Sequence, residues 1–218
     1  MEPVKGKDDL LRRVRTALHG RRCTAPAGGS IPVHAGAGSP AERIELFRSR
    51  FEDLGGTFVS GVSAEAVARP LWEALRGEGV TALLVPDDDR AARSLAHALA
   101  PLGPYKIAAP DEIRQAAPPP CAGIQAAEYA IAETGTLVQT SGGGKTLLPG
   151  LITDVHVALL SPAAFIDRME ECLAALAHNP PRNISFITGP SRTADIELTL
   201  TVGAHGPRKV IAVLLPDR

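Results

Sequence analysis

Apolar side chains recur along this chain with two spacings, one typical of helices and one typical of buried strands. Ile44, Phe47, Phe51 and Leu54 lie on one helical face, and Gly55-Gly56 directly after them is a typical helix end. The same spacing predicts further helices over about residues 8–19, 64–76, 90–99 and 162–176. Short apolar runs predict strands over residues 57–60, 80–85, 137–140, 155–160, 184–188 and 210–215.

This alternation of strands and helices indicates an α/β domain with an open, mostly parallel sheet that is flanked by helices on both faces. We expect this domain to span residues 41–218, although residues 121–132 fit neither a helix nor a strand clearly. Residues 20–40 are rich in Gly, Pro, Ala and Ser, which predicts a linker. Residues 1–40 are therefore predicted to form an N-terminal helix followed by this linker.

Composition narrows the class of protein. The chain has 218 residues, 44% of them hydrophobic and 4% aromatic, so the core of one domain must be built mainly from aliphatic side chains. The formal charge of −1 gives no long-range attraction for nucleic acid or for an anionic membrane. No signal peptide and no apolar run near the roughly 20 residues of a membrane span are evident, so we expect a soluble, cytoplasmic protein.

The three cysteines, Cys23, Cys121 and Cys172, lie far apart in the sequence. An odd number of dispersed cysteines makes a disulfide framework unlikely and suits a reducing compartment. The sequence contains no Cys-x-x-Cys motif, so we expect no iron–sulfur cluster, no zinc site and no other metal or cofactor on this chain alone.

The segment Gly143-Gly144-Lys145-Thr146 resembles the end of a phosphate-binding P-loop. That loop needs a glycine where this chain has Gln139, and it must open a helix, which Pro149-Gly150 would stop. A nucleoside-triphosphatase is therefore excluded. The simpler interpretation is a glycine-rich turn, and the alternative is that Lys145 on this turn closes over an anionic ligand.

Glu133-Thr134-Gly135-Thr136 places a carboxylate and two hydroxyls around a glycine. At a strand end, the hydroxyls and backbone amides of such a segment can bind a phosphate or carboxylate while Glu133 acts as a base. The residue types alone favour the other interpretation, a tight turn in which Thr134 or Thr136 bonds its own backbone.

The segment Gly189–Asp195 follows an apolar strand, and Ser191 is predicted to cap a helix that begins there. Arg192 offers a guanidinium fork for a carboxylate or phosphate, and Thr193 adds a hydroxyl. Asp195 suits the dipole of the predicted helix. An anion site and a plain capping motif remain equally good interpretations at this point.

His156 and His205 are the two histidines that lie next to predicted strand ends. Either side chain could act as a general acid or base, or as a metal ligand. Because the chain has no paired His-x-x-x-His spacing, the metal interpretation is weak, and a turn histidine bonded to backbone is the commoner case.

Several segments that occur in a fixed order carry a family likeness. The chain is similar to the lactate utilization protein C family of the lactate-utilization (LUD) domain group over about residues 41–216, with its specific motifs after Ile124. These motifs are Ile131-Ala132-Glu133-Thr134-Gly135-Thr136, Leu147-Leu148-Pro149, Val155-His156-Val157, Thr188-Gly189-Pro190-Ser191-Arg192-Thr193-Ala194-Asp195-Ile196-Glu197 and Val202-Gly203-Ala204-His205-Gly206-Pro207.

This resemblance implies a fold of the ribose-phosphate isomerase/CoA-transferase-like kind. It also implies a role in L-lactate utilization, in which lactate is oxidised to pyruvate together with two partner proteins that carry the iron–sulfur clusters. The resemblance transfers no catalytic mechanism, so it leaves open whether this chain is itself an enzyme. The chain is expected to act as a subunit of a lactate-oxidising complex without a redox centre of its own.

Together, the motifs predict one shared pocket for a small carboxylate or phosphate ligand. Its catalytic candidates are Glu133 and His205, which would handle a proton. Two alternative functions remain: a stand-alone transferase, isomerase or cyclo-ligase-like enzyme on an anionic substrate, and a non-catalytic scaffold subunit. The predicted ligand-binding residues are Thr134, Gly135, Thr136, Lys145, His156, Gly189, Ser191, Arg192, Thr193 and Asp195.

Overall fold

The computed structural model describes residues 11–16, 38–110, 120–194, 200–202 and 206–216. The chain divides into two compact units, residues 1–35 and residues 36–218. In the first unit residues 11–16 are helical, in agreement with the helix predicted over 8–19. Most of the linker predicted over 20–40 lies outside the described residues.

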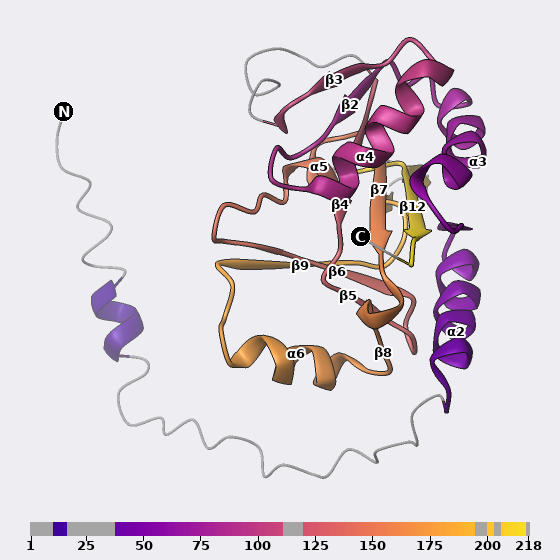
Figure 1. The fold of residues 1–218 in the computed structure, drawn as a ribbon. Coiled ribbons are helices and arrows are strands. Elements are labelled where there is room, and N and C mark those ends of the chain that lie inside the picture. Colours follow the sequence, from indigo (N-terminus) through magenta and orange to yellow (C-terminus); the bar gives the residue numbers. More distant parts are fainter. Residues whose placement is uncertain (1–10, 17–37, 111–119, 195–199, 203–205, 217–218) are drawn as a thin grey trace, which may run out of the picture. The chain divides into compact units, whose positions relative to one another are not determined.

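The larger unit is built on a six-stranded sheet in the order β1-β12-β7-β4-β2-β3, in which every neighbouring pair is parallel (Figure 1). This sheet confirms the open, mostly parallel arrangement predicted from the sequence. The unassigned stretch after residue 120 supplies the central strand β4. The strands are β1 (Thr57–Ser60), β2 (Ala82–Leu84), β3 (Lys106–Ala108), β4 (Cys121–Ala126), β7 (Val155–Leu160) and β12 (Lys209–Leu214).

Two amphipathic helices cover one face of this sheet, α3 (Ala64–Arg76) and α4 (Arg90–Leu99), as the apolar spacing predicts. Ser63 caps the first helix and Asp89 the second, each by accepting a hydrogen bond from a backbone N–H of the first turn. A 3-10 turn, η1 (Ala100–Leu102), follows α4. The buried side chains of this layer include Leu71, Leu75, Leu95 and Leu99 from the helices and Leu83, Ile124, Val157, Ile211 and Val213 from the sheet.

The other face is covered by the helix α2 (Pro40–Asp53) and by a second sheet of four strands, ordered β8-β5-β6-β9. Ser39 and Glu42 form a capping box at the start of α2, and Phe47 and Phe51 of this helix are fully buried. The second sheet consists of β5 (Tyr129–Ile131), β6 (Thr136–Ser141), β8 (Phe165–Ile166) and β9 (Asn183–Ile187). Its far side is covered by α6 (Met169–Ala177), at the lower end of the unit in Figure 1.

The helix predicted over residues 162–176 is wrong in its first half. Residues Pro162–Ala164 form a 3-10 turn, η3, and Phe165 then begins β8, which pairs with β5. Pairing with a neighbouring strand outweighs the helical spacing of the apolar residues. As a result, Phe165 packs against α2, whereas Cys172 of α6 packs against β5 and β6, so the predicted stripe is divided between two clusters.

The helix predicted to begin at Ser191 is also wrong. Residues Arg192–Ala194 form the strand β10, which pairs antiparallel with β11 (Leu200–Val202). Thr193 lies opposite Thr201 in this ribbon, and β-branched residues of this kind favour strands over helices. Residues 195–199 between the two strands lie outside the described residues.

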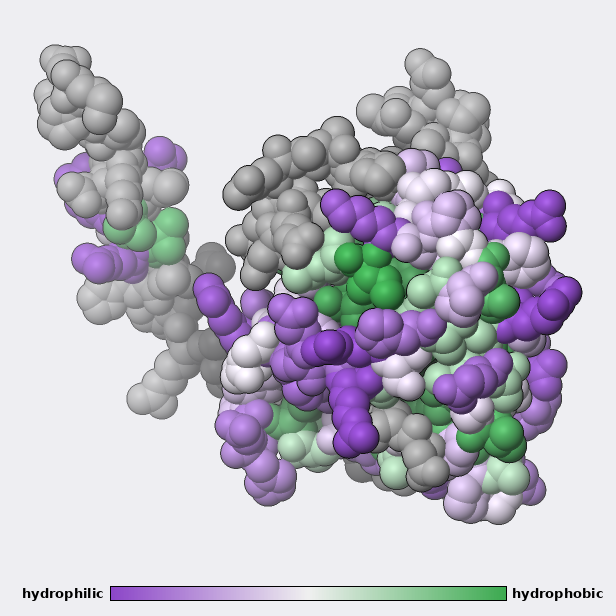
Figure 2. All heavy atoms as spheres, turned by 45° about the horizontal axis from the view of Figure 1, so that its top comes forward, coloured by the Kyte–Doolittle hydropathy of each residue, from purple (hydrophilic) through white to green (hydrophobic). Residues whose placement is uncertain are grey.

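Large apolar side chains are exposed at several places on the larger unit. They are Val62, Ile107, the adjacent pair Leu151 and Ile152, Leu173 and Phe186. Figure 2 accordingly shows green areas that are divided by purple and white ones. Single exposed apolar side chains of this kind are normal for a folded domain. Among the residues that the structure describes, no helix combines the length and apolar character that a membrane span requires.

Candidate functional site

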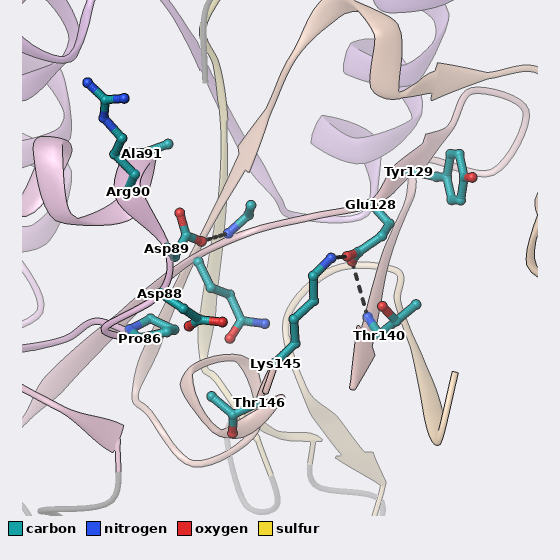
Figure 3. Close-up of a pocket in the computed structure, with 12 residues that line it drawn as sticks. Pro86, Asp88, Asp89, Arg90, Ala91, Glu128, Tyr129, Thr140, Lys145 and Thr146 are labelled. Carbon is teal, nitrogen blue, oxygen red and sulfur yellow. Dashed lines mark hydrogen bonds and ion pairs between the residues drawn. The ribbon is translucent and has the colours of Figure 1, made fainter. Parts of the chain in front are cut away.

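A cavity of about 430 Å³ opens at the carboxyl ends of β2 and β4. β4 lies beside β2 although it follows β3 in the chain, so the direction in which strands are added reverses here. In open α/β sheets, ligands bind in the crevice at such a reversal. Figure 3 shows the side chains that line the cavity. They are Pro86, Asp88, Asp89, Arg90, Ala91, Gln125, Ala126, Glu128, Tyr129, Thr140, Lys145 and Thr146.

Asp89 links the start of α4 to the end of β4, the two segments next to the main sheet that line this cavity. Its Oδ1 accepts a hydrogen bond from the backbone N–H of Ala92 at 2.9 Å, in the first turn of α4. Its Oδ2 accepts one from the backbone N–H of Ala126 at 2.6 Å, at the end of β4. Since both carboxylate oxygens are engaged by backbone donors, Asp89 positions the wall of the cavity.

Lys145 stands on the turn that follows β6 and forms an ion pair with Glu128 across the cavity (Figure 3). The second carboxylate oxygen of Glu128 accepts a hydrogen bond from the backbone N–H of Thr140 at 3.3 Å. The Lys145 side chain is 58% exposed, whereas that of Glu128 is 22% exposed. Glu128 is therefore fixed to the protein, and Lys145 is a cation at the rim that solvent and ligands can reach.

Three polar side chains of this unit are almost fully buried: Gln125, which lines the cavity, is 4% exposed, and Gln139 and His156, which lie next to each other, are 1% and 0% exposed. Gln139 Nε2 lies 3.0 Å from His156 Nε2. With the amide as donor, the ring accepts at Nε2 and carries its proton on Nδ1. Among the described residues, Gln125 Oε1, Gln139 Oε1 and His156 Nδ1 have no hydrogen-bond partner. An unpaired buried polar group costs roughly 1–3 kcal/mol.

Burial lowers the pKa of His156 from its ordinary value of 6.5 to about 4, while the nearby backbone of Gly123 and Pro149 acts in the opposite direction. The ring is therefore neutral at neutral pH. The short helix α5 (Leu148–Leu151) packs directly on this region because Gly123 has no side chain. A Cβ at Gly123 would lie 2.0 Å from the carbonyl oxygen of Pro149.

The predicted Glu133–Thr136 segment forms the turn between β5 and β6, away from this cavity. Glu133 lies 3.9 Å from Arg168 and accepts a hydrogen bond from the backbone N–H of Met169 at 3.4 Å. The hydroxyls of Thr134 and Thr136 are 2.8 Å apart. The turn is thus tied to the start of α6, and the role of Glu133 as a base stays a prediction.

The predicted Gly189–Asp195 segment lies at the carboxyl end of α2. The Arg192 guanidinium donates to the carbonyl oxygen of Leu54 at 2.7 Å, and the backbone N–H of Ser191 donates to Pro207 at 2.8 Å. At Gly189 the backbone has φ of 103°. Thr193 forms part of β10, whereas Asp195 and His205 lie outside the described residues.

The two predicted motifs meet at one point, where the hydroxyls of Thr136 and Thr188 are 2.9 Å apart. The structure therefore brings the Glu133–Thr136 turn next to the segment that leads into Gly189, but it does not bring either of them to Lys145. Of the predicted residues that the structure describes, Lys145 lines the cavity, whereas His156 is fully buried next to Gln139.

Sequence reasoning missed most of the cavity wall. Asp87-Asp88-Asp89 follow the strand predicted over residues 80–85, and acids directly after a parallel strand point to the edge where ligands bind. These acids could therefore have been identified from the sequence. No such signal marks Gln125 or Glu128, because residues 121–132 show no clear helix or strand pattern. Their position near Lys145 depends on how the two sheets pack.

Cys121 and Cys172 are both buried, and burial raises the pKa of each thiol. Buried thiols of raised pKa are poor nucleophiles and poor metal ligands. Within the described ranges, no three side chains of His, Cys, Asp or Glu are grouped to hold a metal ion.

Known proteins resemble parts of this chain. The lactate utilization protein C of Halalkalibacterium halodurans is 37% identical over 102 residues, which cover 44% of this chain and 44% of that protein. The lactate utilization protein C of a Geobacillus species is 36% identical over 102 residues, covering 44% of this chain and 42% of that protein. The chain thus matches less than half the length of these curated relatives.

The crystal structure of a DUF162 family protein from Deinococcus radiodurans has a similar fold. The two superpose with a TM-score of 0.56 over 81% of this chain and 98% of that chain, at 20% sequence identity. The LUD domain matches residues 55–215 of this chain. The family expected from the order of the motifs is thereby confirmed: the chain belongs to the LUD domain family.

Proposed function

We propose that this chain is a component of an L-lactate utilization system and that it binds a small anionic ligand in the cavity beside Lys145. The observation that carries this proposal is the position of Lys145, a cation on an exposed turn above a cavity at the carboxyl edge of the parallel sheet. Membership of the LUD domain family and the names of the curated relatives support the metabolic role.

An incoming carboxylate has a direct place to bind in this arrangement. Lys145 now pairs with Glu128, and an exposed ion pair of this kind contributes at most about 1 kcal/mol, so it can be exchanged for a ligand. Glu128 keeps its hydrogen bond from Thr140 when Lys145 turns to the ligand. Arg90 also lines the cavity, but its guanidinium extends away from Lys145 (Figure 3).

The partners in this proposal are iron–sulfur proteins of the same system. Oxidation of lactate to pyruvate releases two electrons and two protons, so the system needs an electron acceptor. We assign this acceptor to the partner proteins, and the support for this assignment is the resemblance to lactate utilization protein C. The present chain then contributes ligand binding rather than electron transfer.

A second candidate is a stand-alone enzyme on an anionic substrate. It is favoured by Asp88 and Glu128, two carboxylates that line the same cavity as Lys145 and could move a proton there. Turnover of sugar phosphates, acyl-CoA or formyl-folate by the purified chain alone would support this candidate. A folded sample that turns over none of them argues for the binding subunit.

Growth on L-lactate as the carbon source tests the main proposal. A strain of the source organism that lacks this gene should grow poorly, and the wild-type gene should restore growth. Lys145→Met should restore it weakly. Lys106→Met, a matched change of an exposed lysine on β3, should restore it fully. Equal growth with both variants would show that Lys145 is not needed for the function. Normal growth of the deletion strain would contradict the role in lactate utilization.

A further inference from the structure

The exposed face of helix α4 carries three basic side chains and no acidic one. Arg90, Arg93 and His97 are three and four positions apart, so they are neighbours on this face. On helices α2 and α3, in contrast, Arg48 and Arg69 each pair with a glutamate four positions later. Neither Arg90 nor Arg93 forms a salt bridge within the described part of the chain. Their charges are therefore available to an anion from outside the protein.

The stability of the helix does not explain these two arginines. Arg90 is the first residue of α4, and Arg93 follows one turn later. Positive charges at the start of a helix are unfavourable, because this end of the helix dipole is itself positive. The Arg93 guanidinium donates a hydrogen bond to the backbone carbonyl oxygen of Asp87 at 3.3 Å, which holds this side chain near the loop after β2.

Two adjoining cavities open along this basic face. The first has a volume of about 330 Å³ and is lined by Asp87, Asp88, Arg90, Arg93, Ser94 and His97. The second, of about 240 Å³, lies at the carboxyl ends of β2 and β3. It shares Asp87, Arg93 and His97 with the first and adds the apolar residues Val85, Ile107, Ala108 and Ala109. Because the Arg90 guanidinium extends away from Lys145 (Figure 3), the basic face is separate from the anion site beside Lys145.

We propose that these two cavities form one binding site for a nucleoside phosphate. The guanidinium groups of Arg90 and Arg93 offer paired N–H donors, which match the oxygens of a phosphate group. His97 adds a third polar group to the same side of the site. The proposed function does not enter this inference, since Lys145 takes no part in the second site.

The other lining residues favour a nucleoside phosphate over a bare phosphate ion. The Asp87 and Asp88 carboxylates would repel a small anion, but they can accept hydrogen bonds from the hydroxyls of a sugar. Val85 and Ile107, which are 3% and 37% exposed, give the second cavity an apolar floor on which a ring can lie. Phosphate, sugar and ring thus each meet a side chain of suitable chemistry.

Three probes separate the parts of the ligand. ADP carries the phosphates, the sugar and the ring, whereas adenosine lacks the phosphates and pyrophosphate lacks the nucleoside. Calorimetric titration of the full-length protein should give at least about tenfold tighter binding of ADP than of adenosine or pyrophosphate.

Variants connect this binding to the basic face of α4. Arg93→Gln should weaken the binding of ADP by about tenfold, because it removes a guanidinium that contacts phosphate. Arg69→Gln is the matched control, since Arg69 is an exposed arginine on the neighbouring helix α3 and lines neither cavity. Arg93 is exposed as well, so Arg93→Gln should leave the thermal midpoint nearly unchanged, which separates lost binding from lost folding.

Each outcome decides for or against the second site. Preferential binding of ADP that Arg93→Gln weakens and Arg69→Gln preserves supports it. Absence of ADP binding, pyrophosphate binding as tight as that of ADP, or equal ADP affinity in the two arginine variants overturns it. ADP binding that Lys145→Met abolishes and Arg93→Gln leaves intact also overturns it, because the phosphates then bind beside Lys145. The proposed function is tested separately, by growth on L-lactate.

Discussion

One glycine turn precedes strand β6 and another follows it, and the two turns differ in how closely the rest of the protein packs against them. Before β6 the chain passes through Gly135, and after it through Gly142–Lys145. Both turns combine glycine with a threonine and a charged side chain, so their residue types are almost the same. In the first turn Gly135 and Thr136 are buried while Glu133 and Thr134 are exposed, and the second turn lies at the rim of a cavity.

The Gly135 turn is held from several directions. A Cβ at Gly135 would lie 2.6 Å from the backbone nitrogen of Phe51, so α2 packs directly against the turn. The backbone N–H of Glu133 donates a hydrogen bond to the carbonyl oxygen of Asp167 at 3.1 Å, and the Thr136 hydroxyl lies 2.9 Å from that of Thr188. The side chains of Glu133, Thr134 and Thr136 each have a neighbouring polar group within the protein.

The Gly142–Lys145 turn, by contrast, has few neighbours. Nothing lies within 4 Å of a Cβ placed at Gly143, and the Lys145 side chain is 58% exposed. Its charge is balanced by Glu128 across the cavity rather than by the turn itself. Glycine, hydroxyl and charge together indicate a special turn, while packing decides whether that turn serves folding or binding.

The largest expected difference between the turns is in stability. Gly135→Ala should lower the free energy of unfolding by about 3 kcal/mol or more, since it adds a clash with backbone to a φ of 64°. In a thermal melt this corresponds to a loss of roughly 6–12 °C. Gly143→Ala has a similar φ of 59° in open space and should cost about 1 kcal/mol. Equal losses would contradict the distinction between a packed and an open turn.

The buried pair formed by Gln139 of β6 and His156 of β7 should make the stability of the fold depend on pH. The pKa of His156 is about 4 in the folded chain and near 6.5 when unfolded, so the unfolded state takes up the proton first. Stability is therefore full above pH 6.5 and falls as the pH drops towards 4. The loss at pH 5 should be about 2 kcal/mol relative to pH 7.

Urea unfolding at pH 7 and pH 5 measures this effect. Neighbours of the ring include Gln139, Gly123, Pro149 and Gly150, which carry no titrating side chain. The double variant His156→Leu with Gln139→Leu removes the titrating group and its partner together, so its stability should fall less between the two pH values. If both proteins lose the same free energy, His156 is not the source.

The smallest expected effects come from Glu128, the ion-pair partner of Lys145, and from Glu133 in the Gly135 turn. Glu128→Gln should tighten binding of L-lactate by about three- to tenfold, because Lys145 loses the carboxylate that competes with the ligand. The new amide oxygen can still accept from Thr140. Glu133→Gln, at the packed turn, should leave the affinity unchanged and cost under about 1 kcal/mol of stability. A titration in which Glu133→Gln alone alters the affinity would reverse the assignment of the two turns.

Local pattern was enough for much of the fold. The helices over residues 64–76 and 90–99 and the strands over 57–60 and 155–160 form as predicted, because apolar spacing, caps and turns agree there. The pattern failed where tertiary pairing decided, as at Phe165 in β8 and at Arg192 in β10. Four-residue spacing of apolar side chains cannot reveal that a neighbouring strand offers hydrogen bonds.

The cavity was less accessible from the sequence than the fold. Lys145 was identified on its glycine turn, but its ion-pair partner Glu128 lies 17 positions earlier in a stretch without a readable pattern. Gln125 reads as one polar residue in an apolar run, and its unpaired oxygen becomes visible once β4 is placed at the centre of the sheet. Such sites depend on contacts between segments, which no local motif records.

A titration of isotope-labelled protein with L-lactate, followed residue by residue in NMR spectra, tests whether the cavity beside Lys145 is the ligand site. We expect amide shifts to concentrate in residues 125–128 and 142–146, around Lys145, and residues 133–136 to stay unchanged. Shifts that concentrate at Gly135, Thr136 and Thr188 instead would contradict the account and would make the packed turn the ligand site.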